Sequence, residues 1–246
     1  MNHLLEYAHY GEALGNAAAV IRSNAASAGL GAVVWTCDGW TVRDLVAHVG
    51  GGYRWAAAQV RGEEVPAGDR LAEQARASAD LLDWFDDGLI DVLNALGNAP
   101  EDLDVPFFLP NAPAPRLAWA RRQAHESTIH AIDAMAARLG RRPAAGELWF
   151  SEALAVDGVD EFLTGWWVRL ATTGLPPVGV VTDTGPAWIL GPGAGEVRVG
   201  SAEEARRAPA RFTGTASDLY AGLWNRGEVT ASDPAVLAAW REQVRV

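Results

Sequence analysis

The sequence predicts an α+β protein in which a four-helix bundle over residues 1–170 is followed by a small α+β domain over residues 176–246. Three observations support this prediction. Apolar residues recur at helical spacing through the first two-thirds of the chain. A long proline-rich connection, Pro100–Pro115, separates the third helical stretch from the fourth, and some bundles contain such a crossover. After Leu175 the pattern changes to short runs rich in Val, Ile, Thr or aromatic residues, bounded by Gly and Pro, which is typical of strands.

The bundle is expected to contain four helices. The second has the clearest start, because Thr41 can cap the helix while Asp44, three residues later, reaches back to the cap. Gly97 and Gly140 mark the ends of the third and the fourth. The expected helices are residues 3–27, 41–61, 69–96 and 116–139. A fifth helical stretch, Glu147–Leu170, then leads out of the bundle.

The C-terminal domain is expected to alternate short strands with two helices. Helical spacing returns at Ser217–Asn225 and at Pro234–Arg245. The expected strands are Val178–Thr182, Ala187–Leu190, Glu196–Val199 and Arg211–Thr213, with Glu228–Ala231 as a candidate fifth.

Charge and composition exclude several classes of function. The chain has 20 basic and 31 acidic residues and a formal net charge of −11. Neither nucleic acid nor an anionic membrane is an expected partner, because both bind clustered cations. All 20 basic residues are arginine. Without a lysine, Schiff-base chemistry, pyridoxal phosphate anchoring and lysine-dependent phosphate binding are excluded.

The single cysteine and the hydropathy pattern favour a cytoplasmic protein. Cys37 has no cysteine partner, so neither an intrachain disulfide nor a thiolate metal cluster is expected. A nucleophilic role is not expected for it, because it lies in a Trp-flanked segment with no cation in register. No stretch approaches the roughly 18 apolar residues of a membrane span, and Met1–Asn24 does not resemble a signal peptide.

Three side chains form a candidate metal site. Glu126 and His130 are four residues apart on one helix and therefore share a face. His125 is turned away from Glu126 by about 100° and cannot join them. The string therefore differs from the zincin motif, in which two histidines are four residues apart. His48, on the second helix of the bundle, can supply a third ligand if the second and fourth helices face each other.

Two imidazoles and one carboxylate suit Zn²⁺ or a similar divalent metal and leave one coordination position open. The alternative is that the three are partly buried polar side chains satisfied by hydrogen bonds, and spacing alone leaves both interpretations open. Asp133 can orient His130 as a hydrogen-bond acceptor or cap a neighbouring loop. Trp55 and Trp119 are candidates for lining a pocket, and the acidic run Asp157–Glu161 is expected to form a solvated face.

Two sequence blocks resemble signatures of a known family. They are WTCDGWTVRDLVAHVG at residues 35–50 and RQAHESTIHAID at residues 122–133, followed by AVDGVDEFL at residues 155–163. They are similar to the mycothiol-dependent maleylpyruvate isomerase family, which belongs to the DinB-like metal-binding bundles. The resemblance covers most of residues 1–165 and continues more weakly into residues 212–226.

This resemblance implies a DinB-like bundle with His48, Glu126 and His130 as metal ligands. It also implies that mycothiol, a low-molecular-weight thiol, is a cosubstrate whose sulfur is held by a divalent metal, zinc in the expected case. The thiolate would attack an electrophilic small molecule. Elimination of the thiol after bond rotation gives an isomerase, and retention gives an S-transferase. The resemblance further implies that Arg226 is a catalytic arginine facing the metal.

Other interpretations remain open at this point. Arg226 can instead be a cation that complements the dipole of a helix C-terminus. The chain can also be a non-catalytic DinB-like module that binds a metal or a small ligand and acts in regulation. A metal-assisted hydrolase is chemically reasonable, but the sequence contains no identifiable general base for it. The electrophile, the native metal and the oligomeric state do not follow from the sequence.

Overall fold

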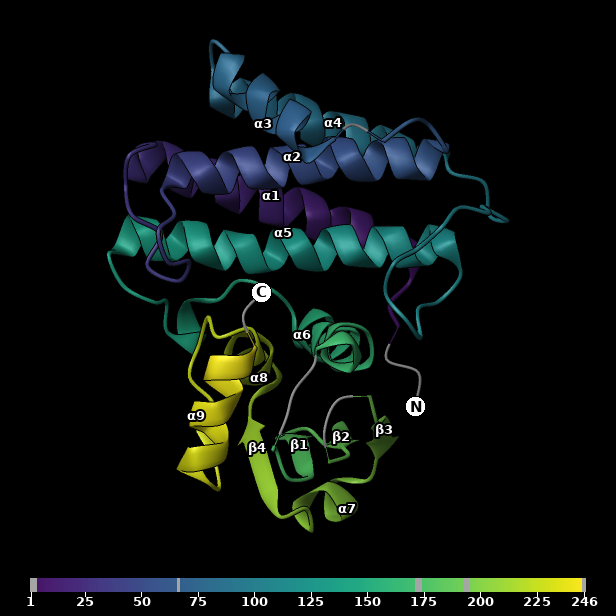
Figure 1. Cartoon of the computed structure of the whole chain (residues 1–246), viewed down its shortest axis with the longest axis vertical. Helices are drawn as coiled ribbons and strands as arrows, with labels where there is room; N and C mark the ends of the chain where they lie inside the picture. The colour runs from purple at the N-terminus through teal and green to yellow at the C-terminus, as the bar shows by residue number, and fades with distance from the viewer. Residues whose placement is uncertain (1–3, 66, 171–173, 193–194, 245–246) are drawn as a thin grey trace. The chain divides into compact units, whose positions relative to one another are not determined.

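The computed structural model describes residues 4–65, 67–170, 174–192 and 195–244. The chain forms two compact units (Figure 1). One contains Glu6–Phe108 and Pro113–Pro143, and the other contains mainly Ala144–Val246 together with Leu109–Ala112. The fold class predicted from the sequence, a helix bundle followed by a small α+β domain, is confirmed. Residues 3 and 245, the outer ends of two expected helices, lie outside the described residues.

Four long helices form the bundle. They are α1 (Tyr7–Ala28), α2 (Val42–Arg61), α4 (Leu81–Asn98) and α5 (Pro115–Leu139). Helix α1 packs mainly on α5, while α2 packs on both α4 and α5 (Figure 1). A shorter helix, α3 (Gly68–Ala77), lies against α2. The second and fourth predicted helices are α2 and α5, so the condition under which His48 can join Glu126 and His130 is met.

The single helix predicted over residues 69–96 is wrong. The chain leaves the helical conformation at Ser78, and a new helix, α4, begins after Asp80. The side chain of Asp80 accepts hydrogen bonds from the backbone N–H groups of Leu82 and Asp83. An N-cap of this kind satisfies donors that a continuous helix would have paired internally. The apolar spacing continues across the break, so periodicity alone did not reveal it.

Helix α2 has the predicted start and tolerates its glycines for a packing reason. The capping box between Thr41 and Asp44 is present. A Cβ atom on Gly50 would lie 2.6 Å from the Trp84 ring, and one on Gly88 of α4 would lie 2.9 Å from the Gly50 carbonyl oxygen. Glycine at these positions therefore allows α2 and α4 to approach closely. Arg54 lies over the Trp84 ring at 3.9 Å from its centroid and strengthens the same contact.

The second unit is built on a five-stranded mixed sheet in the order β3-β2-β1-β4-β5. Strands β1 and β4 are parallel, and the other neighbouring pairs are antiparallel. The strands are β1 (Val178–Thr182), β2 (Ala187–Leu190), β3 (Val197–Gly200), β4 (Ala210–Gly214) and β5 (Thr230–Ala231). All five agree with the predicted runs to within a residue or two. Helices α8 (Ala216–Leu223) and α9 (Pro234–Gln243) also lie where expected, whereas α7 (Ala202–Arg206) was not predicted.

Residues 144–170 belong to the unit that contains the sheet, although the sequence-based division placed them with the bundle. They form a 3₁₀ turn (Ala145–Glu147), helix α6 (Glu152–Glu161), a π turn (Phe162–Trp166) and a last 3₁₀ turn (Trp167–Arg169). Helix α6 packs on α8. The solvated acidic face expected here is wrong, because Asp157 and Glu161 are buried and Asp160 accepts a hydrogen bond of 2.9 Å from Trp188 Nε1.

Gly179 in β1 gives the first testable prediction. A Cβ atom at this position would lie 2.0 Å from the carbonyl oxygen of Ala205 in α7. Because a backbone carbonyl cannot rotate away, the Gly179→Ala variant should lower the free energy of unfolding by about 2 kcal/mol or more. Urea denaturation measures this. Gly146→Ala, where a Cβ meets open space, is the matched control, and equal stabilities of the two variants would contradict the packing of α7 on β1.

Among the described residues, no helix combines the length and the apolar character needed to cross a bilayer.

Candidate metal centre

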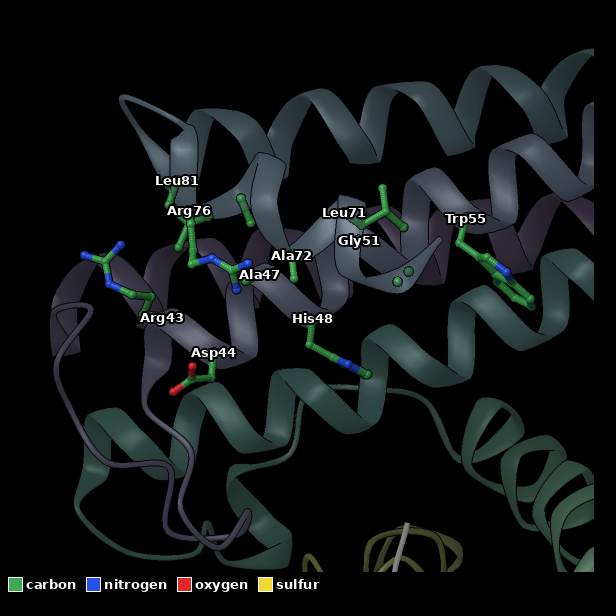
Figure 2. Close-up of a pocket in the computed structure, with 13 residues that line it drawn as sticks. Arg43, Asp44, Ala47, His48, Gly51, Trp55, Leu71, Ala72, Arg76 and Leu81 are labelled. Atoms are coloured by element: carbon green, nitrogen blue, oxygen red, sulfur yellow. The ribbon is translucent and has the colours of Figure 1, made fainter. Parts of the chain in front are cut away.

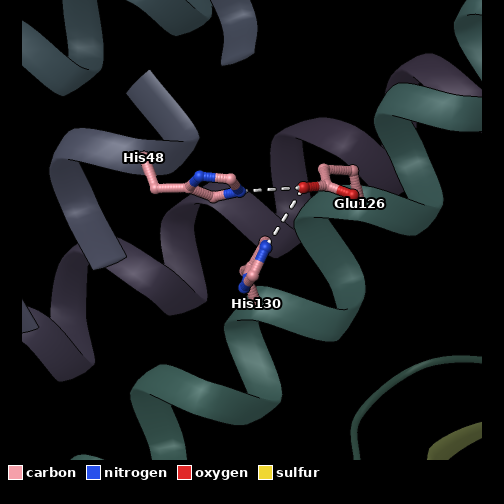
Figure 3. A group of neighbouring side chains, drawn as sticks. All are labelled: His48, Glu126 and His130. Atoms are coloured by element: carbon pink, nitrogen blue, oxygen red, sulfur yellow. Dashed lines mark hydrogen bonds and ion pairs between the residues drawn. The ribbon is translucent and has the colours of Figure 1, made fainter. Parts of the chain in front are cut away.

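His48, Glu126 and His130 converge at one place between α2 and α5 (Figure 3). His48 Nε2 and His130 Nε2 lie 3.3 Å and 3.1 Å from the same oxygen, Glu126 Oε1. The side chains of His48, Glu126 and His130 are 47%, 28% and 10% exposed. The cluster is therefore anchored in the bundle on the His130 side and accessible on the His48 side.

Local sequence explains how the three side chains meet. Glu126 and His130 stand one above the other because they are four residues apart in the uninterrupted helix α5. His48 lies in the second turn of α2, whose start is set by the Thr41–Asp44 capping box. Since α2 packs on α5, a histidine on the facing side of α2 reaches the pair.

The arrangement fits a divalent metal. The three ligand atoms lie within 4.8 Å of one another. Two ligand atoms bound tetrahedrally at about 2.0–2.1 Å are about 3.3 Å apart, which is the spacing from each imidazole nitrogen to the Glu126 carboxylate. Two neutral imidazoles and a carboxylate are the donor set of several catalytic zinc sites. The hydrogen-bonded alternative also matches these contacts, and metal binding is taken up below as a proposal.

Asp133 holds His130 and a distant loop at the same time. Its Oδ2 accepts a hydrogen bond of 2.9 Å from Nδ1 of His130, which leaves Nε2 directed at Glu126. The same carboxylate also accepts hydrogen bonds from the Thr36 hydroxyl and, at 3.3 Å, from the Cys37 thiol. Asp133 therefore fulfils both of the roles that the sequence left open, because it orients the histidine and fastens the loop before α2.

Electrostatics at the site favour a positive charge. Burial raises the pKa of Glu126, but the charge of the neighbouring His130, the hydrogen bonds from His130 and His48, and the charge of Arg122 outweigh it and hold that pKa well below its usual value. Burial alone would lower the pKa of His130, whereas the carboxylates of Glu126 and Asp133 raise it to about 9. The two carboxylates thus flank the His130 ring and stabilise a positive charge there.

Sequence reasoning missed two neighbours of the cluster. Trp40 stacks on His130 with ring centroids 6.2 Å apart and also lies 5.0 Å from the His48 ring. Arg122 donates a hydrogen bond of 3.0 Å to Glu126 Oε2. The Arg122 contact could have been read from the i, i+4 spacing on α5. The position of Trp40 depends on how the loop before α2 folds against α5, and no local sequence pattern predicts this contact.

The remaining candidate residues lie elsewhere. His125 is fully buried and faces Tyr10 of α1, which confirms that it points away from the cluster. Trp55 and Trp119 pack on each other at 5.1 Å between ring centroids. Arg226 belongs to the other unit, follows α8 and is buried, and its Nη1 donates a hydrogen bond of 2.7 Å to the Trp224 carbonyl oxygen.

Replacing Asp133 should weaken the binding of a metal by His48, Glu126 and His130. The Asp133→Ala variant loses the acceptor that orients His130, and loss of such a partner typically lowers metal affinity about 10- to 100-fold. A competition titration against a chelating dye measures the affinity. Thr36→Val is the control, because it removes a hydrogen bond to Asp133 but leaves the one to His130. Unchanged affinity in Asp133→Ala would contradict the orienting role.

One family profile and two related crystal structures are similar to this chain. The sequence profile of a family described as the mycothiol maleylpyruvate isomerase N-terminal domain matches residues 11–135, a range that contains His48, Glu126 and His130. The crystal structure of the mycothiol-dependent maleylpyruvate isomerase is similar, with a TM-score of 0.66, 17% sequence identity and 93% of each chain covered. A histidine-to-alanine mutant of that enzyme matches with a TM-score of 0.65 at the same identity and coverage. No curated protein sequence matches the chain.

Proposed function

The chain belongs to the mycothiol maleylpyruvate isomerase N-terminal domain family, and from this premise we propose that it is a metal-dependent enzyme that uses mycothiol to isomerise or S-conjugate an electrophilic small molecule. The observation that supports this proposal most strongly is the convergence of His48, Glu126 and His130 within one bundle. Their donor types match a catalytic site rather than a closed structural one, because three protein ligands leave a coordination position free.

In this proposal the three side chains hold one divalent metal, with zinc as the expected ion. The metal, when bound, would lower the pKa of a thiol from its reference of about 8.5 and so supply a thiolate at neutral pH. His48 is the most exposed of the three ligands, so the thiol is expected to approach from its side. Glu126 contributes the negative charge that retains the cation, while the hydrogen bond to Asp133 and the stacking of Trp40 fix the His130 ring.

Arg226 is proposed as the second functional group. A guanidinium can hold a carboxylate of the electrophile or of the thiol through two parallel hydrogen bonds. Its burial and its hydrogen bond to the Trp224 carbonyl oxygen are equally suited to a helix-end role. The catalytic assignment therefore rests on the family resemblance, and the arginine variants described in the Discussion test it.

The proposal separates two reactions by the fate of the thiol. Attack by the thiolate on an unsaturated carbon gives an adduct in which rotation about the former double bond becomes free. Loss of the same thiol then gives the isomer and regenerates mycothiol. Retention of the carbon–sulfur bond gives a stable conjugate and consumes mycothiol. The balance of free thiol after complete turnover therefore distinguishes the isomerase from the S-transferase.

Turnover of a panel of electrophiles tests the proposed function. The protein is loaded with zinc and assayed with and without mycothiol, and the products and the remaining thiol are quantified. We expect turnover that requires both zinc and mycothiol and is lost in His48→Ala. Zinc and mycothiol binding without turnover of any electrophile would favour the non-catalytic binding module instead. Turnover that is independent of the thiol would contradict the proposal.

A further inference from the structure

A cavity of about 540 Å³ lies between α2 and α3, and it adjoins the candidate metal centre through His48 (Figure 2). Its volume is within the range of small-molecule sites. One wall is a stripe on α2 that includes Arg43, Ala47 and His48 and continues to Trp55. The other wall is a stripe on α3 at helical spacing, which includes Leu71 and Arg76. The cavity lies wholly within the bundle unit.

The two ends of this cavity differ in chemistry. Arg43 and Arg76 lie at the end where α2 begins, and Figure 2 shows Arg76 extending from α3 toward Ala47 on α2. Trp55 lies at the opposite end. Between the two ends the lining is mostly apolar or small, because apart from His48 it consists of alanines, glycines and leucines. The cavity therefore has one cationic end and an apolar body.

Neither of the two arginines is held in an ion pair within the described residues of the bundle. Within the part of the chain that the structure describes, neither Arg43 nor Arg76 forms a salt bridge. Most other arginines of the bundle are occupied, as in the pairs of Arg22 with Asp86 and Arg61 with Asp91. Asp44 also lines this end, but its carboxylate is engaged by the Thr41 backbone and hydroxyl in the capping box. Arg43 also interacts electrostatically with this carboxylate, which leaves Arg76 as the guanidinium without a carboxylate partner. In a chain with a net charge of −11, such a guanidinium at one end of a cavity favours an anionic ligand.

The spacing along α2 sets the dimensions of that ligand. At a rise of about 1.5 Å per residue, Arg43 lies about 7.5 Å along the helix axis from His48, and Trp55 lies about 10 Å beyond His48. A molecule anchored at the cationic end therefore passes beside His48 before it reaches Trp55. Gly51 and Gly52 keep the α2 wall open there, because neither carries a side chain into the space between His48 and Trp55.

We propose that this cavity binds the electrophilic substrate and that the substrate is an organic acid with an extended apolar body. Its carboxylate is held by Arg76 at the cationic end, its reactive carbon lies beside His48, and its apolar remainder lies against Leu71 and Trp55. This inference rests on the proposed function insofar as it makes the bound acid a substrate. The binding of such an acid by the cavity is independent of that function.

Calorimetric titration with octanoate tests binding directly. Octanoate has the predicted carboxylate and apolar body, and its neutral amide, octanamide, is the matched ligand. We expect octanoate to bind, with an affinity that rises about fourfold per methylene from hexanoate to decanoate. The Arg76→Gln variant should weaken octanoate binding about tenfold without affecting octanamide. Arg70→Gln, on the same helix but outside the cavity lining, should have no effect. Equal affinities for octanoate and octanamide would overturn the assignment of the cationic end.

A second pair of variants separates the cavity from the metal centre. A Cβ atom on Gly52 meets open space, so Gly52→Leu should fold normally and fill the cavity, abolishing octanoate binding. Gly15→Leu on α1, where a Cβ also meets open space, should leave binding intact. The titration is repeated after treatment with a chelator, so that a carboxylate bound to metal cannot account for the signal. Octanoate binding that persists in Gly52→Leu, or that disappears on chelation, would overturn the proposal.

Inhibition kinetics then connect the cavity to turnover. Octanoate should compete with the electrophile and not with mycothiol, and the Arg76→Gln variant should raise the KM of the electrophile while leaving kcat unchanged. Competition with mycothiol instead would assign the cavity to the thiol and overturn this inference. If no electrophile is turned over while octanoate binds as predicted, the proposed function fails and the cavity assignment stands.

Discussion

The His130→Ala variant is expected to lose at least about 100-fold in affinity for zinc. Loss of a residue that only orients a ligand costs up to about that factor, and His130 is itself a proposed ligand. Its Nε2 lies 3.1 Å from Glu126 Oε1, and its ring is the most buried of the three side chains. Elemental analysis of the purified variant, followed by competition titration, measures the loss.

His125→Ala is the control for this variant. His125 is on the same helix and fully buried, but it faces Tyr10 rather than the cluster. This variant should lose stability, because it opens a space in the core, and should still bind zinc at the level of the unchanged protein. Equal metal content in the unchanged protein, His130→Ala and His125→Ala would show that His48, Glu126 and His130 are a hydrogen-bonded group and not a metal centre.

Replacing Arg226 by lysine is expected to lower kcat/KM about 100-fold, the loss seen when a single group that stabilises charge in a transition state is removed. Lysine retains the positive charge but cannot form two parallel hydrogen bonds to one carboxylate. Zinc content should not change, because all three proposed ligands precede residue 131 in the chain. Steady-state kinetics with the zinc-loaded protein and mycothiol measure the effect.

Arg241→Lys is the matched control in the same unit. Arg241 lies in the last turn of α9 and pairs with Glu228 at the surface, so its replacement should leave kcat/KM unchanged. Full activity in Arg226→Lys would support the helix-end role of Arg226, in which its guanidinium serves the Trp224 carbonyl oxygen. Lower thermal stability of Arg226→Lys at full activity would strengthen that conclusion.

Local signals explain which elements could be predicted from the sequence. The start of α2 follows from a capping box that involves Thr41 and Asp44 alone, and the pairing of Glu126 with His130 follows from helical spacing alone. The strands were found because glycine and proline bound each run. The break before α4 was missed although Asp80 is a good N-cap residue, because the apolar periodicity on both sides of it is continuous. Helix α7, with five residues, is too short for a periodic pattern.

Contacts between distant segments could not be predicted in this way. Thr36 and Cys37 are separated from Asp133 by nearly a hundred residues, and their hydrogen bonds depend on how the loop before α2 folds back on α5. The stacking of Trp40 on His130 has the same origin. The burial of Asp157 was mispredicted because a run of acidic residues has the composition of a solvated face. Tertiary packing determines whether an acidic side chain is buried, and composition alone does not predict that packing.

The most direct test of the central claim is a titration of the cobalt-substituted protein with mycothiol, followed by optical absorption. Cobalt accepts the same nitrogen, oxygen and sulfur donors as zinc but has visible and near-ultraviolet bands. No electrophile is needed, so the test does not depend on knowing the substrate. We expect a sulfur-to-cobalt charge-transfer band that saturates with mycothiol, is absent with S-methylated mycothiol and is absent in His130→Ala. A spectrum that does not change at saturating mycothiol would contradict the claim that this site binds a metal in order to activate a thiol.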